Sequence, residues 1–193
     1  MHNLSDEELM LEYQKGVVAA MDELLRRYKN PIFHFTFRLC RNTAEAEDLT
    51  QEVFLRIHQY RDGYRPCGKF STWIFSIAHN ICISTLRKRK RWLSWLRKED
   101  DPQQLEDVAS PDPSPQEEVS QHEVVGVVQE CIKGLPFLQR EALILREYEH
   151  LDYQEIAKIL NKSLGAVKTL IRRARMNLKD KLLPVLGEVK GGL

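Results

Sequence analysis

The segment between residues 100 and 120 is the feature that most restricts how this chain can fold. It contains the run Ser-Pro-Asp-Pro-Ser-Pro and combines proline, serine, glutamine and acidic residues with few large apolar side chains. Such a segment cannot bury enough apolar surface to offset its ordering entropy, and its prolines and like charges keep it extended. We therefore predict an acidic, proline-rich linker at 96–121, two small domains at 1–95 and 122–187, and a disordered tail at 188–193.

Both domains are predicted to be all-α, because apolar residues recur at spacings of three and four and the alternation typical of strands is missing. Ser5 with Glu8 forms a capping box that opens the first helix, and Asn42 begins another. Pro31 is expected to break the chain between the second and third helices. A loop is predicted at 63–68, and further helices at 71–91, 122–133, 136–149, 152–160 and 164–183.

Charges are segregated along the chain, although the formal net charge is only +1. Residues 87–98 carry seven basic and no acidic side chains, 99–123 carry nine acidic and no basic ones, and 163–193 carry seven basic against two acidic. Near-neutrality therefore results from two positive segments that a negative linker cancels. Two basic segments at the ends of predicted helices favour a polyanion as a partner.

Several classes of protein are disfavoured by what the sequence lacks. No run of about 18 apolar residues predicts a membrane span, and the acidic N-terminus does not resemble a signal peptide. The four cysteines are far apart, and the histidines form no metal-binding, nucleophile or phosphate-binding motif. We therefore expect a cytoplasmic protein with no catalytic residue, no metal, no cofactor, no membrane insertion and no small-molecule substrate.

The last two predicted helices form a helix-turn-helix by their length and spacing. Asp152 with Glu155 caps the first of them, and Ser163 caps the second. In the major groove, arginine can bond a guanine edge while lysine and threonine reach phosphates or bases. The alternative to DNA binding is that the second of these helices is simply amphipathic and that its polar face contacts only solvent. At about 100° per residue, the face opposite the apolar stripe carries Thr169, Arg172 and Met176, flanked by Lys168 and Arg173.

The helix predicted at 71–91 begins with aromatic and apolar residues and ends in five consecutive basic ones, at 87–91. Aromatic rings beside a basic track suit single-stranded nucleic acid, in which bases stack on the rings while cations hold the backbone. Aromatic residues at helical spacing more often belong to a core. We therefore expect no more than one or two of the following to contact bases: Phe70, Trp73, Phe75 and Ile77.

Several segments together resemble the extracytoplasmic-function (ECF) group of bacterial RNA polymerase sigma factors, in the sigma-70 family. They are Glu-Asp-Leu-Thr-Gln-Glu-Val-Phe-Leu-Arg at 47–56, Phe-Ser-Thr-Trp-Ile followed by Ile-Ala-His-Asn within 70–80, and the C-terminal segments 135–141, 153–157 and 165–168. The similarity covers nearly the whole chain, in the family's order and with the linker in its place. It implies a two-domain factor that directs core RNA polymerase to promoters.

The resemblance also implies residue roles. The first domain would bind the clamp helices of the largest polymerase subunit and melt the −10 element, and the second would meet the flap of the second-largest subunit and read the −35 element. The core-binding positions are Asp48, Gln51, Glu52 and Arg56. The −10 positions, with the basic run, are Lys69, Phe70, Ser71, Trp73, His79, Asn80, Arg87, Lys88, Arg89 and Arg91. The −35 positions, with the rest of the polar face, are Ser163, Lys168, Thr169, Arg172, Arg173 and Met176.

Further expectations follow from the same resemblance. Factors of this group are typically held by an anti-sigma factor, often membrane-anchored, and released on a stress signal. Sequestration at the inner membrane face is therefore expected here. The linker's carboxylates resemble a nucleic-acid backbone in charge, which suggests that it threads the polymerase's positive RNA channel. One departure from the family is Leu170, which stands where arginine is common.

Two rival functions remain open on the sequence alone. An ordinary helix-turn-helix regulator with a helical dimerisation or ligand-binding domain would bind duplex DNA by itself, as a dimer on a palindrome. A helical nuclease or metal hydrolase using scattered histidine and glutamate side chains would show activity with a divalent ion. A sigma factor differs from both, because it confers promoter-specific starts on core polymerase and binds DNA poorly without it.

Overall fold

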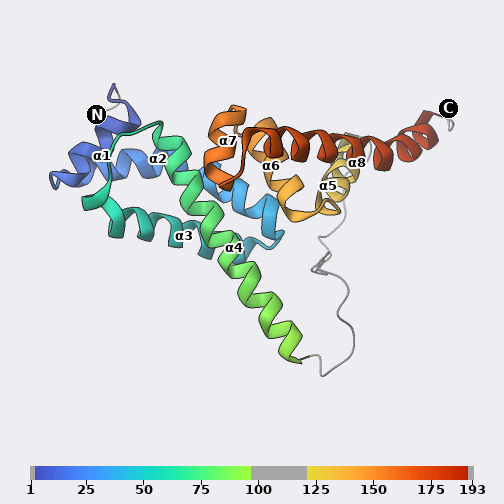
Figure 1. Cartoon of the computed structure of the whole chain (residues 1–193), viewed down its shortest axis with the longest axis horizontal. Helices are drawn as coiled ribbons and strands as arrows, with labels where there is room; N and C mark the ends of the chain where they lie inside the picture. The colour runs from blue at the N-terminus through green and yellow to red at the C-terminus, as the bar shows by residue number, and fades with distance from the viewer. Residues whose placement is uncertain (1–2, 97–120, 191–193) are drawn as a thin grey trace.

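The computed structural model describes residues 3–96 and 121–190, and within these it is all-helical, as predicted (Figure 1). The first part holds α1, α2, α3, a short 3-10 turn and the long α4, and the second holds a bundle of four helices. The bounds are α1 Asp6–Gln14, α2 Val18–Cys40, α3 Thr43–Tyr60, η1 Arg61–Gly63, α4 Phe70–Leu96, α5 Gln121–Lys133, α6 Phe137–Glu147, α7 Tyr153–Leu160 and α8 Leu164–Lys190.

The predicted break at Pro31 is wrong, because α2 runs through this residue without interruption. A proline inside a helix costs about 3 kcal/mol, since it removes one backbone hydrogen bond and crowds the preceding turn. Leu24 precedes Pro31 and Phe35 follows it, and both are fully buried, as is Ile32. Burying each such side chain contributes about 1.5–3 kcal/mol, so core packing outweighs the local preference.

The helix starts follow the predicted capping residues. Ser5 and Asp152 each close a complete capping box, with Glu8 and Glu155 respectively, at the starts of α1 and α7. The Asn42 side chain accepts a hydrogen bond from the backbone N–H of Glu45 at the start of α3, at 2.8 Å. These starts agree with the sequence because a cap is a local interaction among residues three apart. The end of α8 lies later than predicted, at Lys190.

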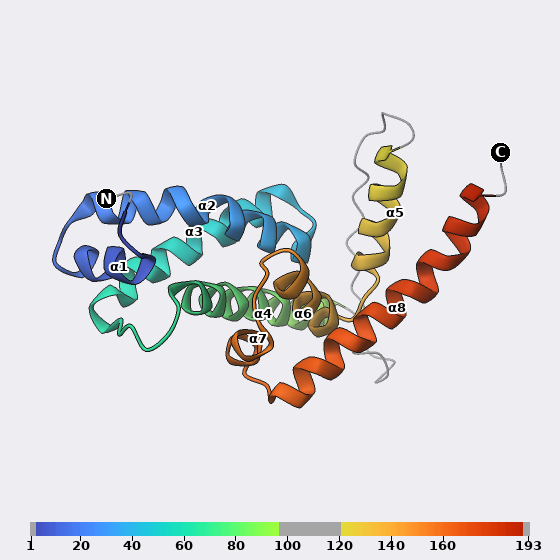
Figure 2. The ribbon, with the colours of Figure 1, turned by 90° about the horizontal axis from the view of Figure 1, so that it is seen from above.

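The two halves of the molecule pack against each other instead of standing apart. One buried cluster contains Ile74 and Ile77 of α4 together with Ile144 of α6 and Ile156 of α7. Helix α4 packs on α7, and α2 packs on α6, as Figure 2 shows from above. The predicted linker lies almost entirely outside the described residues, as does the end of the predicted tail, and the domain boundaries remain a prediction.

Candidate nucleic-acid and polymerase interfaces

The exposed side of α8 carries the residues predicted to read duplex DNA. The buried side of α8 carries Val167, Ile171 and Ala174, so the opposite side of this helix faces outward. The hydroxyl of Ser163 accepts a hydrogen bond from the N–H of Ala166 at 3.2 Å, so this residue caps the helix as predicted. Met176 is 52% exposed. Four further predicted contacts are also exposed, namely Lys168, Thr169, Arg172 and Arg173.

The turn between α7 and α8 is fixed by local interactions. Asn161 ends α7 in the left-handed conformation, with φ 50°, which asparagine tolerates better than most residues. At the other end of α7, backbone N–H groups of Glu155 and Gln154 hold the pKa of Asp152 below its usual range. Arg175 of α8 contacts Glu147 of α6 at 2.6 Å. The position of α8 is therefore set by a short turn and by packing, as in a helix-turn-helix.

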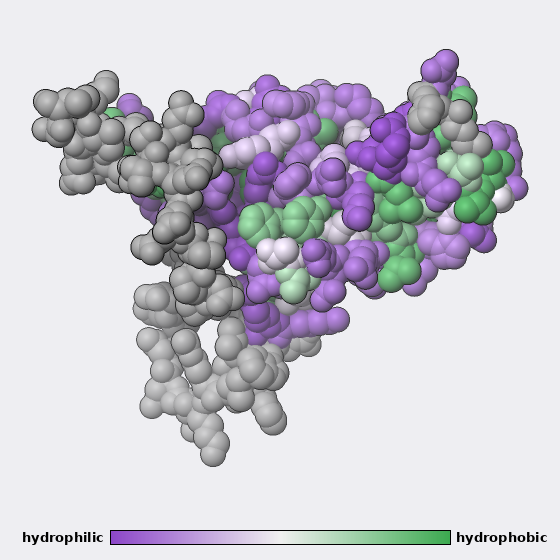
Figure 3. All heavy atoms as spheres, turned by 180° about the vertical axis from the view of Figure 1, so that it is seen from behind, coloured by the Kyte–Doolittle hydropathy of each residue, from purple (hydrophilic) through white to green (hydrophobic). Residues whose placement is uncertain are grey.

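A groove between α2 and α3 combines apolar and polar side chains. The groove consists of two adjoining hollows, one lined by Leu25, Phe54 and Leu55 and the other by Phe33, and Gln51 lines both. Leu55 is 55% exposed and is an apolar side chain on a helix face that is otherwise polar. Figure 3 shows apolar patches within the hydrophilic surface on the side of the N-terminal helices. Exposed apolar surface rimmed by polar residues is typical of a protein interaction site.

The predicted polymerase contacts lie on α3 beside this groove. Asp48 and Gln51 are exposed, whereas Glu52 forms an ion pair with Arg56 at 2.7 Å. Of the four, the groove is lined only by Gln51. The apolar side chains of the groove are not among the polymerase contacts predicted from the sequence. An apolar residue at position 55, on the face that also carries Asp48, was the signal that could have found the groove.

The start of α4 mixes exposed and buried members of the predicted −10 set. Lys69 is exposed and Ser71 and Trp73 are partly exposed, but Phe70 is fully buried. The Phe70 ring packs against the rings of Tyr28, Tyr64 and Trp73, and a side chain enclosed in this way does not meet a base. Of the two aromatic residues in the predicted −10 set, Trp73 is therefore the one whose side chain is partly exposed to solvent.

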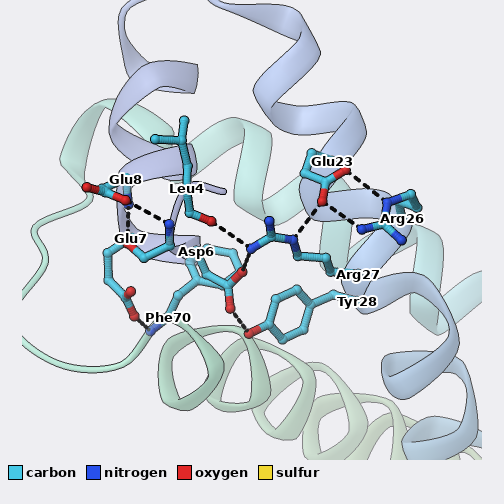
Figure 4. Close-up of polar contacts among 10 residues, drawn as sticks. Leu4, Asp6, Glu7, Glu8, Glu23, Arg26, Arg27, Tyr28 and Phe70 are labelled. Carbon is cyan, nitrogen blue, oxygen red and sulfur yellow. Dashed lines mark hydrogen bonds and ion pairs between the residues drawn. The ribbon is translucent and has the colours of Figure 1, made fainter. Parts of the chain in front are cut away.

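Helix α1 holds the start of α4 in place (Figure 4). The carboxylate of Glu7 accepts a hydrogen bond from the backbone N–H of Phe70 at 2.6 Å. Asp6 accepts from Arg27 at 2.7 Å and from Tyr28 at 2.5 Å, which joins α1 to α2. Burial and the Asp6 carboxylate raise the pKa of Tyr28. The loop before α4 is therefore fixed at its end by a side chain from a helix about sixty residues earlier.

Replacing Glu7 by alanine is expected to destabilise the full chain by about 0.5–2 kcal/mol, the usual cost of losing a helix cap. Without the carboxylate, the Phe70 N–H loses its acceptor. Urea denaturation followed by circular dichroism measures the change, and Glu7→Gln, which keeps an acceptor oxygen, is expected to lose less. Equal midpoints for Glu7→Ala and the unaltered chain would contradict the role of this cap.

His79 forms a buried hydrogen bond between the two halves instead of facing solvent. Its Nδ1 lies 2.7 Å from Oε1 of Glu141 in α6, and the two residues are 5% and 0% exposed. Burial raises the pKa of Glu141, and the hydrogen bond from His79 opposes that shift. Asn80, the next predicted contact, is exposed. The sequence missed this arrangement because the partners stand 62 positions apart.

The basic run of α4 is largely open to solvent. Arg87 and Lys88 are exposed, and Arg89 is partly exposed, 3.8 Å from Glu45 of α3. The side chain of Arg91 lies outside the described part of the chain.

Within residues 3–96 and 121–190, no group of three or more His, Cys, Asp or Glu side chains is placed to hold a metal ion. In the same residues, no helix is long and apolar enough to cross a membrane.

Fold and surfaces together define an all-helical protein with a helix-turn-helix and an outward cationic face. Residues 24–92 match the family model for Sigma-70 region 2, and residues 126–178 match that for Sigma-70 region 4. The chain therefore belongs to the sigma-70 family of RNA polymerase sigma factors, in its ECF group. It is a factor for transcription initiation.

Curated relatives support the group assignment. The RNA polymerase sigma-H factor of Pseudomonas aeruginosa is 32% identical over 190 residues, which cover 95% of this chain and 96% of that protein. The ECF sigma factor SigW of Bacillus subtilis is 31% identical over 175 residues, or 89% and 93% of the two chains. The ECF sigma factor SigE of Mycolicibacterium smegmatis is 32% identical over 168 residues, which span 87% of this chain but 63% of that protein.

Two solved structures share the fold. One is the sigma factor RpoE of Bartonella quintana, in complex with the anti-sigma factor NepR, with 25% identity, a TM-score of 0.65, and 83% and 95% of the two chains covered. The other is CnrH in complex with the cytosolic domain of CnrY, with 20% identity, a TM-score of 0.67 and 92% and 96% coverage. The second likeness bears on the fold alone.

Proposed function

We propose that this sigma factor reads the −35 element with α8 and melts the −10 element with the surface around α4. The observation that carries the proposal is the outward face of α8, where Lys168, Thr169, Arg172 and Arg173 are all exposed while the opposite face is buried. A helix placed in this way can enter the major groove and present arginine to base edges. The residue assignments within both elements are part of the proposal.

The N-terminal half supplies strand capture in this proposal. Trp73 offers a partly exposed ring, and Lys69 and Asn80 offer exposed polar groups near it on α4 and the preceding loop. Stacking of an unpaired base on an aromatic ring lowers the free energy of the melted state. Arg87 and Lys88 hold the adjoining phosphates, so binding weakens steeply with salt. The chain binds core polymerase through the groove between α2 and α3, against the clamp helices.

Regulation by an anti-sigma factor is a further part of the proposal. The sigma factor of Bartonella quintana with which this chain shares its fold was solved bound to such a partner. A partner that covers the groove between α2 and α3 would keep the factor from core polymerase until a stress signal releases it. The flap contact of the second domain and the placement of the acidic linker stand as proposals of the same kind.

A run-off transcription assay with core RNA polymerase tests the proposed function. Adding the purified chain to core polymerase and genomic templates is expected to produce new starts, whose upstream sequences share two elements. The chain alone is expected to bind the same duplexes weakly. Tight duplex binding by the chain alone, as a dimer and without any change in the start sites of core polymerase, would instead identify an ordinary helix-turn-helix regulator.

A further inference from the structure

A cavity opens where α2 meets the C-terminal half of the molecule. Its volume is about 370 Å³, which lies in the range of sites that bind small organic molecules. Its walls come from α2, from α5 and from the residue that follows α6, and α2 packs on α6 beside it (Figure 2). None of the lining residues is among those assigned above to DNA or to core polymerase.

One part of the wall is aromatic and apolar. The rings of Phe37 and Tyr148 line it together with the aliphatic side chains of Val128 and Ile132. Tyr148 is 40% exposed, and Phe37 and Val128 are partly exposed. Flat ring systems pack well on aromatic side chains, in offset or edge-to-face contacts. This part of the wall therefore suits the apolar portion of a ligand.

Two arginines of α2 give the cavity positive charge. They stand three positions apart and so lie on one face of the helix. The guanidinium of Arg38 lies over the ring of Tyr148, 4.0 Å from its centroid, and has no hydrogen bond or ion pair with any residue that the structure describes. Arg41 donates to the backbone carbonyl of Gln129 at 2.7 Å. Both guanidinium groups therefore keep donors for a further acceptor.

Arg41 is held at this place against two local costs. Its Nε is buried and has no hydrogen-bond partner among the described residues, and burial lowers the pKa of its guanidinium, since a cation is less stable away from water. Its backbone is left-handed, with φ 59°, which is uncommon for arginine. Glu130 opposes the pKa shift, but its carboxylate pairs with Lys133 at 3.4 Å. An anion in the cavity would satisfy the unpaired donor.

One carboxyl group near the cavity acts against an anion, but only weakly. Glu149 is close enough to Arg38 for the guanidinium to favour the ionised form of its carboxyl. Burial is the larger effect and raises the pKa of Glu149 to about 7. At neutral pH the group is therefore uncharged in about half of the molecules. It repels an anion less than an ordinary glutamate would, so the positive charge of the arginines prevails.

We propose that this cavity is a binding site for a small aromatic anion, whose flat ring packs on Phe37 and Tyr148 while its phosphate or carboxylate bridges Arg38 and Arg41. Guanidinium groups bind both kinds of oxyanion through paired N–H groups, which makes arginine the suited cation here. The site is independent of the proposed function, which uses none of these residues. Because its walls come from both halves of the described chain, a bound molecule links them.

Isothermal titration calorimetry on the full chain, at neutral pH and physiological ionic strength, tests the site. The probes are adenosine monophosphate, which joins a ring to a phosphate, and naphthoate, which joins a ring to a carboxylate. Adenosine and inorganic phosphate are the matched controls for the two parts of the first probe. At the efficiency usual for a ligand of about 23 non-hydrogen atoms, adenosine monophosphate is expected to bind with a dissociation constant of the order of 10 µM.

Substitutions of opposite charge effect separate this site from general charge attraction. Arg38→Ala and Arg41→Ala are each expected to weaken binding of adenosine monophosphate by about tenfold or more, and Glu149→Gln is expected to tighten it by about 2- to 5-fold. Arg26→Ala is the matched control on α2, because Arg26 pairs with Glu23 instead of lining the cavity. Circular dichroism checks folding, and the two arginine variants decide independently if one of them misfolds.

The acidic linker of the same chain is the rival occupant of the cavity, because it adjoins α5 and carries many carboxylates. A variant that replaces five of them with amides distinguishes the two occupants, namely Glu99→Gln, Asp100→Asn, Asp101→Asn, Glu106→Gln and Asp107→Asn. Similar affinity of this variant and of the unaltered chain supports a site for a free anion. Binding of the probes to this variant alone would identify the linker as the occupant and overturn the proposal.

Binding of one probe and not the other supports the site and identifies the oxyanion that it accepts. The proposal is overturned if neither probe gives a saturable heat in the millimolar range, or if Arg26→Ala loses as much affinity as Arg38→Ala. Inorganic phosphate that binds as tightly as adenosine monophosphate would equally refute a site for an aromatic ligand. None of these results bears on promoter-specific starts with core polymerase, so failure here is distinct from failure of the proposed function.

Discussion

Replacing Leu55 by aspartate is expected to weaken binding to core RNA polymerase by at least about 30-fold, which corresponds to about 2 kcal/mol. Leu55 is 55% exposed and lies in the groove between α2 and α3 with Phe54 and Leu25. An apolar side chain in a groove is a typical anchor of an interface, and a carboxylate in its place would be buried without a partner on binding.

The same change is expected to leave the fold intact, because a side chain that is mostly exposed contributes little to the core. Surface plasmon resonance with immobilised core polymerase measures the affinity, and urea denaturation checks stability. Leu183→Asp is the matched control, since Leu183 is 57% exposed and lies on α8, far along the chain from the groove. Unchanged affinity of Leu55→Asp, or an equal loss for Leu183→Asp, would refute the assignment of the groove to core polymerase.

Replacing Arg172 by alanine is expected to weaken −35 duplex binding by roughly 5- to 150-fold, the range given by about 1–3 kcal/mol for one bidentate base contact. Arg172 is exposed on the outward face of α8, where its guanidinium donates a long hydrogen bond to the Met176 sulfur at 3.9 Å. It is therefore free to turn towards a base edge without breaking a strong interaction in the protein.

Arg172→Lys separates base reading from charge. Lysine keeps the positive charge but lacks the planar two-pronged geometry, so discrimination between −35 sequences should fall while the salt dependence changes little. Arg26→Ala is the control for loss of one charge, because Arg26 is an exposed arginine on α2 that pairs with Glu23. Fluorescence anisotropy titrations measure the affinity of each variant for −35 duplexes with the matched and with an altered sequence. If the Arg172 variants lose the same factor of affinity on both duplexes, Arg172 contacts a phosphate and not a base.

The helices could largely be predicted because their signals are local. The caps at Ser5, Asn42 and Asp152 act on residues within one turn, and the apolar stripe around Val167 repeats with the helix period. The face of α8 followed directly from that stripe, since a helix buried on one side must turn the other outward. Pro31 failed as a stop signal because core packing on both sides of it outweighs its local cost.

The interaction surfaces depended on contacts between distant parts of the chain. The groove arises where α2 and α3 lie side by side, so its apolar wall is divided between residues about thirty positions apart. Burial of Phe70 likewise depends on Tyr28 and Tyr64, which the sequence alone does not bring together. A periodic pattern tells which side of a helix is apolar, but not which neighbour covers it.

By itself, the sequence determined that this protein is helical and that its family is that of the sigma factors, and it predicts a division at an acidic linker. Those properties depend on composition, on interactions within a few residues, and on the order of short motifs. Only the tertiary structure decided that His79 faces Glu141 in the other half and that Lys69 meets Glu155. Long-range burial sets the environment of these side chains, and no local pattern encodes which distant residue will bury a given one.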